Sequence, residues 1–479
     1  MSMHDCCAPG AKKPNRHYDL AVVGAGSAGF SAAITAAELG ANVALIGHGT
    51  IGGTCVNTGC VPSKTLIRAA ETLHQASAAA RFAGVRAESR IEDWGAVVRQ
   101  KDELVSSLRQ AKYVDLLPSY NTVAYLEGRA QLTNGGITVD GNAVKAGKVI
   151  MATGASPSLP PIAGMEKVPH LTSTTALELE RLPQSLLVVG GGCIGCELGQ
   201  MFARAGVAVT IVDIVPVLSA GEPEISQAVA GYFRGEGIVV RESVETTAIR
   251  KTARGVALDI SADGKDETLE AERVLVTTGR RPNTAGLRLV LAGIALLPNG
   301  GIKVDDRMRT TKPGFYAAGD VTGRDQFVYM AAYGARIAAE NALNGDSKRY
   351  DATAMPSVVF TDPQVASVGL TEAQARKKGL SVKTSVLPLD YVPRALAARD
   401  TRGLIKLVAE ATSGKLLGAH ILAPEGADSI QTAALAIRQE LTVDDLTDTI
   451  FPYLTTVEGL KLAALSFGKD VAKLSCCAG

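Results

Sequence analysis

Cysteines are the residues of this sequence best suited to chemistry, and they fall in four close pairs. The pairs are Cys6/Cys7, Cys55/Cys60, Cys193/Cys196 and Cys476/Cys477. In a reducing compartment such pairs indicate redox or metal chemistry rather than structural cross-links. Thiol chemistry is therefore the first functional class to consider.

One pair lies in a distinctive segment that directly follows a predicted nucleotide-binding strand. It reads Gly52-Gly53-Thr54-Cys55-Val56-Asn57-Thr58-Gly59-Cys60-Val61-Pro62-Ser63-Lys64. A dithiol at this place, where the ring of a bound flavin would lie, can accept two electrons and pass them on as thiolates. A structural disulfide is the alternative, and a cytoplasmic location with flanking glycines disfavours it.

A glycine-rich turn precedes this segment. Gly24, Gly26 and Gly29 form a complete G-x-G-x-x-G between a predicted strand (20–23) and a helix that runs to about residue 39. Glycine lets the backbone turn tightly and approach a pyrophosphate at the helix N-terminus. The next strand (42–46) is followed by Gly47, so the acid expected to bind the ribose is missing.

A second turn repeats the pattern. Gly190, Gly192 and Gly195 lie between a strand (186–189) and a helix ending near residue 205, and the following strand ends at Asp213. An acid there accepts hydrogen bonds from an unphosphorylated ribose and repels a 2′-phosphate. We therefore expect NADH to be preferred over NADPH.

Bulk properties narrow the class of protein. The chain has 479 residues, too many for one core, and 49 basic against 48 acidic residues, so no nucleic-acid partner is expected. No apolar run approaches the roughly 20 residues of a membrane span, and no signal peptide is visible. We expect a cytoplasmic protein without membrane insertion.

We predict an α/β fold with two Rossmann-like nucleotide-binding domains, for FAD and NAD(P)H, plus a C-terminal α+β dimerisation domain. The predicted parts are a flexible arm (1–16), an FAD domain (17–155 and 276–349), an NAD(P)H domain (156–275) and a dimerisation domain (350–479). Helical spacing marks 64–112, 426–439 and 457–467, and short strands are expected in 121–149 and at 357–360, 381–387, 403–408 and 417–422.

The dithiol segment resembles the signature of flavin disulfide reductases, the family of glutathione reductase and dihydrolipoamide dehydrogenase. The likeness extends to Ala152-Thr153-Gly154, Thr278-Gly279-Arg280 and Ala317-Ala318-Gly319-Asp320. It implies that Cys55 is the interchange thiol, that Cys60 is the flavin-proximal thiol, and that Lys64 pairs with Glu197 beside the flavin N5. The implied FAD ligands include Gly53, Thr54, Lys64, Thr153, Gly154 and Asp320, and Gly279 joins the NAD(P)H site.

Two features depart from reductases of organic disulfides. Tyr453 stands where those enzymes carry a histidine base, and a tyrosine with an ordinary pKa near 10 cannot replace that proton shuttle. The chain also ends in Cys476-Cys477, adjacent thiols too close for an ordinary disulfide. A two-thiol tail suits ligand exchange with a soft metal ion.

Both features resemble the mercuric reductase branch of the family. The resemblance implies Hg(II) as substrate, bound by Cys55, Cys60, Cys476 and Cys477, and a homodimer in which the tail of one subunit serves the dithiol of the other. Tyr453 and Tyr113 are similar to the two tyrosines that assist the metal at the inner site.

Alternatives stay open at this point. One is a dihydrolipoamide dehydrogenase-like enzyme acting on an organic disulfide, and another is a non-catalytic metal-binding or redox-sensing protein. Cys193 and Cys196 more simply pack a turn against a cofactor, although a helix N-terminus there would lower a thiol pKa. The six histidines do not have the spacing of metal ligands. For Cys6 and Cys7, a role in collecting metal ions and no role at all are equally open.

Overall fold

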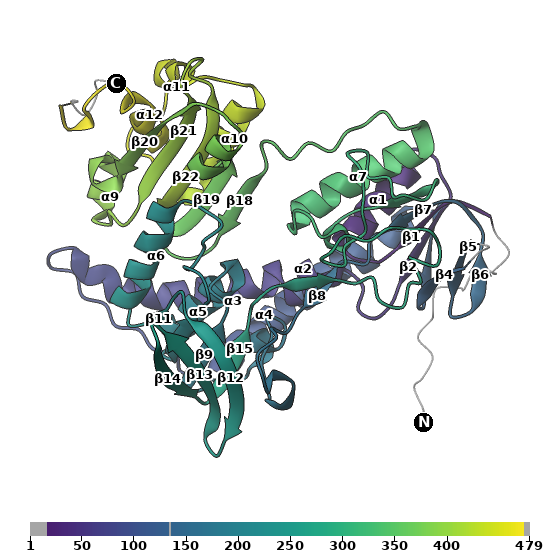
Figure 1. The fold of residues 1–479 in the computed structure, drawn as a ribbon, viewed down its shortest axis with the longest axis horizontal. Helices are drawn as coiled ribbons and strands as arrows, with labels where there is room; N and C mark the ends of the chain where they lie inside the picture. The colour runs from purple at the N-terminus through teal and green to yellow at the C-terminus, as the bar shows by residue number, and fades with distance from the viewer. Residues whose placement is uncertain (1–16, 134–135, 474–479) are drawn as a thin grey trace. The chain divides into compact units, whose positions relative to one another are not determined.

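The computed structural model describes residues 17–133 and 136–473, so the predicted arm and the Cys476/Cys477 tail lie outside the described residues. The chain forms two compact units (Figure 1). Unit 1 takes residues from 1–62, 100–157 and 280–351, and unit 2 from 63–99, 158–279 and 352–479. The three-domain division drawn from the sequence stays a prediction.

Unit 1 is built on a parallel sheet with the strand order β17-β7-β1-β2-β3. These strands are β1 (Tyr18–Val23), β2 (Val43–Gly47), β3 (Val123–Glu127), β7 (Ala146–Met151) and β17 (Phe315–Ala317). The central strands are mostly apolar, apart from Asp19 in β1 and Lys148 in β7, because both faces of the sheet are covered. One face packs on α1 (Ser27–Glu38) and α7 (Val328–Asn344).

The other face of this sheet packs on a three-stranded antiparallel sheet of β4 (Ala130–Thr133), β5 (Gly136–Val139) and β6 (Asn142–Val144). Where the chain leaves unit 1 and returns to it, β8 (Ala155–Pro157) pairs with β16 (Arg280–Pro282). This arrangement leaves the carboxyl ends of the parallel strands available for ligands.

Unit 2 contains a second parallel sheet, in the order β11-β10-β9-β15. Its strands are β9 (Ser185–Val189), β10 (Ala208–Val212), β11 (Val239–Arg241) and β15 (Arg273–Val276). An antiparallel sheet of β12 (Glu245–Thr252), β13 (Gly255–Ala262) and β14 (Lys265–Ala271) packs beside it. The helices α3 (Cys60–Ser77), α4 (Trp94–Arg109), α5 (Cys193–Arg204) and α6 (Pro223–Gly235) contribute to a shared apolar core.

Residues after 352 form an antiparallel sheet in the order β18-β19-β22-β21-β20. The strands are β18 (Pro356–Val359), β19 (Gln364–Gly369), β20 (Val382–Pro388), β21 (Leu404–Glu410) and β22 (Leu416–Ala423). The helices of this part are α8 (Glu372–Lys377), α9 (Pro393–Ala398), α10 (Gly426–Arg438), α11 (Val443–Asp448) and α12 (Glu458–Leu465). Together they enclose their own core.

The predicted fold class is confirmed, with both strand-turn-helix units where the glycine motifs placed them. The sequence reading missed β19, a strand whose alternating pattern is weakened because it lies in the middle of a buried sheet. It also missed the short helices α8, α9 and α11, which are too short for amphipathic periodicity; α8 and α11 begin with capping boxes, and α9 begins with a proline.

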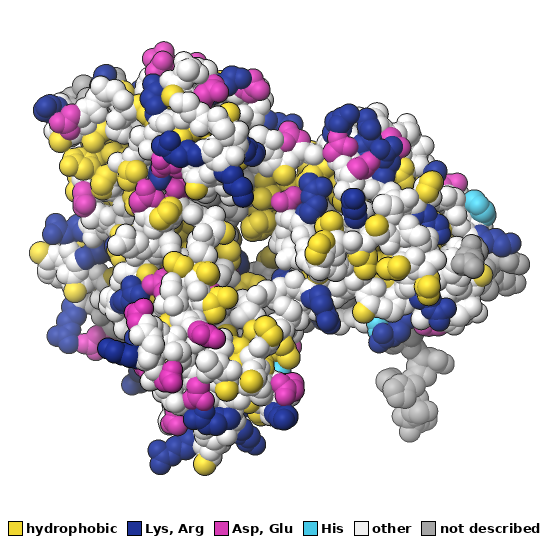
Figure 2. All heavy atoms as spheres, viewed as in Figure 1, with side chains coloured by type: hydrophobic (Ala, Val, Ile, Leu, Met, Phe, Trp, Pro, Cys, Tyr) yellow, Lys and Arg dark blue, Asp and Glu magenta, His cyan; other side chains and the backbone are white. Residues whose placement is uncertain are grey.

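Acidic and basic side chains intermingle over the face of the molecule shown in Figure 2. Over the ranges that the structure describes, no helix is long and apolar enough to cross a membrane.

Candidate active site

The loop that carries the dithiol is joined to the first glycine turn by backbone contacts. The Gly52 amide donates a hydrogen bond of 2.9 Å to the Ala25 carbonyl. Gly53 has φ +69°, and a Cβ placed on it would lie 2.5 Å from the Gly26 Cα. Gly53 therefore cannot gain a side chain without separating the dithiol loop from the turn.

The two cysteines lie on consecutive helices. Cys55 is on the short α2 (Gly53–Thr58) and is partly exposed, while Cys60 is the exposed first residue of α3. Gly59 makes the break between these helices, and a Cβ there would lie 2.9 Å from the Thr54 carbonyl oxygen. The amino end of an 18-residue helix favours negative charge, which suits a thiolate at Cys60.

Asn57, between the two cysteines, holds this loop together. Its amide donates hydrogen bonds of 2.9 Å to the carbonyls of Ile51 and Gly53, and its oxygen accepts one of 3.0 Å from Arg109. The sequence analysis did not single out Asn57 or Arg109. An amide side chain enclosed by glycines and cysteines was the available signal, because such a residue usually bonds to nearby backbone.

Tyr113 lies beside the dithiol. It belongs to a π-helical turn (110–114) that continues α4, a feature often found at functional sites. Its ring meets Phe30 edge-on, with 4.8 Å between centroids, and a Cβ on Gly52 would come within 3.2 Å of it. Burial raises the pKa of Tyr113, and negative charge on Cys55 and Cys60 adds to this effect. The phenol is therefore protonated at neutral pH.

Both glycine turns have the shape that a pyrophosphate site needs. In unit 1, a Cβ on Gly24 would lie 2.2 Å from the Ala152 oxygen, and one on Gly29 would lie 1.7 Å from the Gly24 oxygen. In unit 2, a Cβ on Gly195 would lie 1.9 Å from the Gly190 oxygen. The N-cap residues of α1 and α5 are Gly26 and Gly192. Neither has a side chain that could accept hydrogen bonds from the first amides of its helix. Those amides suit a phosphate, so FAD and NAD(P)H fit the two turns.

The remaining candidates for the flavin site meet where β7, β16 and β17 end. The Thr153 hydroxyl donates to the Asn283 carbonyl at 2.8 Å, and the Gly154 carbonyl accepts the Asn283 amide at 2.9 Å. The Asp320 carboxylate lies 3.9 Å from the Arg280 guanidinium. Burial raises the pKa of Asp320, and the arginine charge acts in the opposite direction.

Asp213 ends β10 in unit 2 and supports the second glycine turn. One carboxylate oxygen accepts the Gly191 amide at 2.5 Å, and the other accepts the Val215 amide at 3.2 Å. A carboxylate has lone pairs left for further donors, so these bonds are compatible with ribose binding. Gly279, with φ +142°, lies near Ser158, where the chain leaves unit 2.

Lys64 and Glu197 form an ion pair of 2.6 Å in unit 2. The second Glu197 oxygen accepts the Phe360 amide at 2.9 Å, and the Lys64 ammonium lies 4.9 Å from the centre of the Phe360 ring. All three residues line a cavity of about 160 Å³. The segment before β19 thus fixes both partners of the pair, which the sequence analysis did not anticipate.

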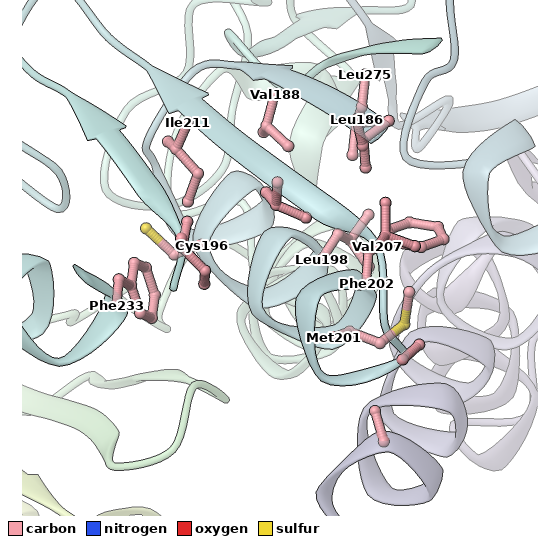
Figure 3. Packing of buried hydrophobic residues seen from close by; sticks show 14 of the residues in the cluster. Leu186, Val188, Cys196, Leu198, Met201, Phe202, Val207, Ile211, Phe233 and Leu275 are labelled. Carbon is pink, nitrogen blue, oxygen red and sulfur yellow. The ribbon is translucent and has the colours of Figure 1, made fainter. Parts of the chain in front are cut away.

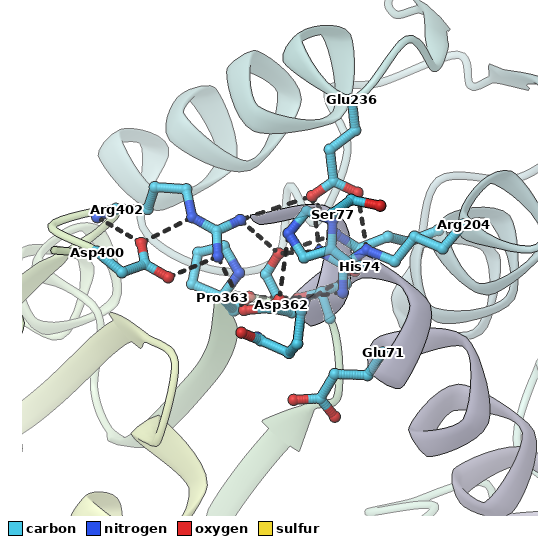
Figure 4. Close-up of polar contacts among 12 residues, drawn as sticks. Glu71, His74, Ser77, Arg204, Glu236, Asp362, Pro363, Asp400 and Arg402 are labelled. Atoms are coloured by element: carbon cyan, nitrogen blue, oxygen red, sulfur yellow. Dashed lines mark hydrogen bonds and ion pairs between the residues drawn. The ribbon is translucent and has the colours of Figure 1, made fainter. Parts of the chain in front are cut away.

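One face of α5 binds the backbone of that segment. Gln200 exchanges two hydrogen bonds with the Asp362 backbone, at 2.8 Å and 2.9 Å. Arg204 approaches the Asp362 carboxylate to 3.0 Å, and Arg402 approaches it to 3.2 Å from the other side (Figure 4). Residues 197, 200 and 204 recur at helical spacing, so they face the segment together.

In the second C-x-x-C pair, Cys196 is a packing residue. Cys196 is fully buried in the apolar core among Leu198, Ile211 and Phe233 (Figure 3), and its thiol donates to the Gly191 carbonyl at 3.2 Å. Burial raises its pKa well above the ordinary value. The helix begins at Cys193 rather than at Cys196, so the expected lowering of a thiol pKa by a helix N-terminus does not occur at Cys196.

Tyr453 lies in unit 2, on an exposed turn between α11 and α12. The turn is held by the Leu454 amide, which donates to the Glu458 carboxylate at 3.1 Å, and Leu454 adopts φ +61°. Burial raises the pKa of Glu458. The cysteines at 6, 7, 476 and 477 lie outside the described residues, and within the described ranges no cluster of three metal-ligating side chains occurs.

Comparisons with known proteins agree with this site. The model of the pyridine nucleotide-disulphide oxidoreductases matches residues 18–339, and the model of their dimerisation domain matches residues 355–464. This chain belongs to that family. The protein is therefore an FAD- and NAD(P)H-dependent oxidoreductase, as predicted from the dithiol segment and the two glycine turns.

Individual relatives are similar over nearly their full length. A mercuric reductase of Lysinibacillus sphaericus is 47% identical over 97% of this chain and 85% of its own, and one of Streptomyces lividans is 46% identical over 96% and 98%. Among solved structures, a Cu(II) complex of the HOCl-induced flavoprotein disulfide reductase RclA from Escherichia coli has a TM-score of 0.83 at 30% identity, covering 95% of this chain and 100% of its own. LpdA from Mycobacterium tuberculosis has a TM-score of 0.82 at 28% identity, covering 94% and 100%.

Proposed function

We propose that this protein reduces thiolate-bound Hg(II) to Hg(0) with electrons from NAD(P)H. The observation that carries the proposal is the grouping of Cys55, Cys60 and the protonated Tyr113 in unit 1. Sulfur is the donor that a soft ion prefers, and a neutral phenol beside it adds no competing charge. Full-length similarity to several mercuric reductases supports the same substrate.

The bound cofactors supply a hydride and a two-electron relay. NAD(P)H and Hg(II) give NAD(P)⁺, Hg(0) and one proton, so electrons balance without a disulfide substrate. Cys476 and Cys477 hand the ion by thiolate exchange to Cys55 and Cys60, with Tyr113 and Tyr453 assisting. Lys64 and Glu197 form a fixed ion pair in unit 2, and Asp213 favours NADH.

We propose a homodimer in which the tail of one subunit serves the dithiol of the other. The match to a dimerisation domain supports dimer formation. Large apolar side chains of this part are exposed in the single chain, among them Leu396, Leu435, Ile450 and Tyr453, with Ile450 at 94%. The reaction consumes reduced nicotinamide and needs free thiols, so we place it in the cytoplasm.

The decisive experiment measures NADH and NADPH oxidation with Hg(II) in excess small thiol, together with release of mercury vapour. Cys55→Ala should abolish both signals, and Cys476→Ala/Cys477→Ala should lower them strongly. Cys6→Ala/Cys7→Ala removes an adjacent cysteine pair at the other end of the chain and should retain activity. If lipoamide rather than Hg(II) drove NADH oxidation, the protein would act on an organic disulfide and the proposal would be wrong.

A further inference from the structure

The first glycine motif lacks the acid that usually binds the adenosine ribose, and the structure shows what fills the space. Gly47 ends β2 with an ordinary extended backbone, so its conformation does not require glycine. Glycine is required because there is no space for a side chain at this position. A Cβ on Gly47 would lie 2.5 Å from the Tyr125 hydroxyl oxygen and 2.8 Å from the Ala25 Cβ.

The register of the sheet explains how Tyr125 reaches this place. β3 pairs with β2 in parallel, with Tyr125 opposite Leu45. Both side chains belong to the apolar cluster on the α1 face of the sheet. Because side chains alternate along a strand, a side chain at Gly47 would point to the same face as Leu45. The tyrosine is long enough to extend from the level of Leu45 to that of Gly47, at the carboxyl edge where nucleotides bind.

We propose that the Tyr125 hydroxyl replaces the missing carboxylate and binds the adenosine ribose of FAD. A phenol donates one hydrogen bond and accepts others, so it can serve a ribose hydroxyl in either sense. Ala25, which packs against the same space, belongs to the pyrophosphate turn, so the phenol lies between that turn and the end of β2. The inference concerns the family cofactor and is independent of mercury as substrate.

The surroundings of the phenol keep its proton in place. Burial raises the pKa of Tyr125, and the nearby Glu127 carboxylate adds to this effect. The hydroxyl is therefore a neutral donor throughout the physiological range, whereas a carboxylate could only accept.

The first test compares flavins with and without the adenosine ribose. In the full-length protein freed of flavin, Tyr125→Phe should raise the Kd of FAD about threefold to tenfold, the effect of one lost neutral hydrogen bond. The Kd of FMN, which has no adenosine, should not change. Tyr316→Phe removes the hydroxyl of a buried tyrosine bonded to Asp346 in the same unit, and should leave the affinity for both flavins unchanged.

The second test exchanges the two positions. Gly47→Glu alone should weaken FAD binding because the new side chain collides with Tyr125. Gly47→Glu/Tyr125→Ala/Ala25→Gly provides the acid and removes both groups that a Cβ at position 47 would meet, and it should bind FAD at least threefold more tightly than Tyr125→Ala/Ala25→Gly.

Two results would overturn the proposal. In one, Tyr125→Phe weakens FAD and FMN equally, which would mark Tyr125 as a packing residue. In the other, adding Gly47→Glu gives no gain over Tyr125→Ala/Ala25→Gly. Neither measurement uses mercury, so a failure here would leave the proposed reaction untouched, and absence of mercury reduction would leave this inference standing.

Discussion

A π-helical turn decides where the Tyr113 phenol lies. Such a turn holds one residue more than the α-helix it continues, so the side chains within it are rotated from the positions that an α-helix would give them. Phe30 and Gly52 then hold the ring from two sides. The sequence identified Tyr113 by resemblance alone, because nothing in its composition reveals a π turn.

Tyr113→Phe should lower kcat/KM for Hg(II) about threefold to tenfold, since a phenyl ring preserves the packing but removes one hydrogen-bonding group. Reduction of ferricyanide by NADH should stay at the wild-type rate, because that reaction bypasses the dithiol. Steady-state assays with both acceptors measure the difference, and an equal loss in both would indicate a general structural defect.

Asp213→Asn should lower the ratio of kcat/KM for NADH to that for NADPH about tenfold, since the change removes the charge that repels a 2′-phosphate. An amide oxygen can still accept one of the two backbone bonds at this turn. Asp259→Asn, an equivalent change on β13 of the antiparallel sheet, should leave the ratio unchanged. A ratio unaltered by Asp213→Asn would refute the assigned NADH preference.

At the level of elements, α5 joins the second nucleotide-binding sheet to the segment before β19 within unit 2. Its residues Glu197, Gln200 and Arg204 bind backbone or carboxylate groups of residues 360–362. The Lys64–Glu197 pair therefore depends on a segment that lies about 160 residues later in the sequence than Glu197. Sequence patterns report periodicity within one helix, and they give no sign of which distant loop a polar stripe will bind.

Gln200→Leu should speed hydrogen exchange at the Asp362 amide about tenfold or more, because that buried amide loses its acceptor, while the Asp362 carbonyl keeps its bonds from Arg204 and Arg402. Exchange across β19 should not change, since its amides are held by the neighbouring strands. Hydrogen–deuterium exchange of the holoenzyme measures both regions at once. Uniform acceleration would instead indicate loss of the whole C-terminal sheet.

A buried lysine secures another junction inside unit 2. Lys406 is 2% exposed and lies 2.9 Å, 2.7 Å and 3.1 Å from the carboxylates of Glu222, Glu224 and Glu372. His420 lies 3.6 Å from Glu222 in the same cluster. The cluster brings α6 and α8 against β21 and β22, and no sequence pattern predicted it because its members are scattered along the chain.

Lys406→Met should destabilise the protein by about 3–5 kcal/mol, because three carboxylates lose their shared cation. Lys415→Met, which breaks an exposed pair with Glu440, should cost far less, because solvent screens a surface pair. Urea denaturation at matched flavin occupancy compares the two. Equal effects would show that the buried cluster contributes no more than a surface pair.

The same cluster predicts a pH dependence. Hydrogen bonds from Arg376 and Lys406 lower the pKa of Glu372, so its contribution to stability is complete above the ordinary carboxyl pKa and is lost as pH falls through the lowered value. The difference in stability between wild type and Lys406→Met should therefore shrink as the pH falls below the ordinary carboxyl pKa. A difference that stayed constant from neutral pH to pH ~3 would contradict this assignment.

For the whole molecule, the glycine turns and the dithiol segment were enough to predict the fold class, both nucleotide sites and the family. What escaped prediction depends on contacts between distant parts, such as Asn57 with Arg109 and Glu197 with Phe360. The missing acid at Gly47 was visible in the sequence, but its replacement by Tyr125 required the sheet register.

Ile450→Lys places a charge on the most exposed large apolar side chain near Tyr453 and should dissociate the proposed dimer. Mercury reduction should then fall at least tenfold if the two subunits share each site, while ferricyanide reduction continues. Sedimentation and both assays test this at one protein concentration. A monomer with full mercury reductase activity would exclude shared sites.

The backbone joint between Gly26 and Gly53 also limits how this protein can be re-engineered. A dithiol loop from a relative can be transplanted only if it keeps glycine at position 53, because a methyl group there would lie 2.5 Å from the Gly26 Cα and force the loop away from the turn. The stretch just before the joint is more tolerant. Gly49 is exposed with open space around its Cα, so this is where the length of the graft can be adjusted and where a reporter group can be inserted.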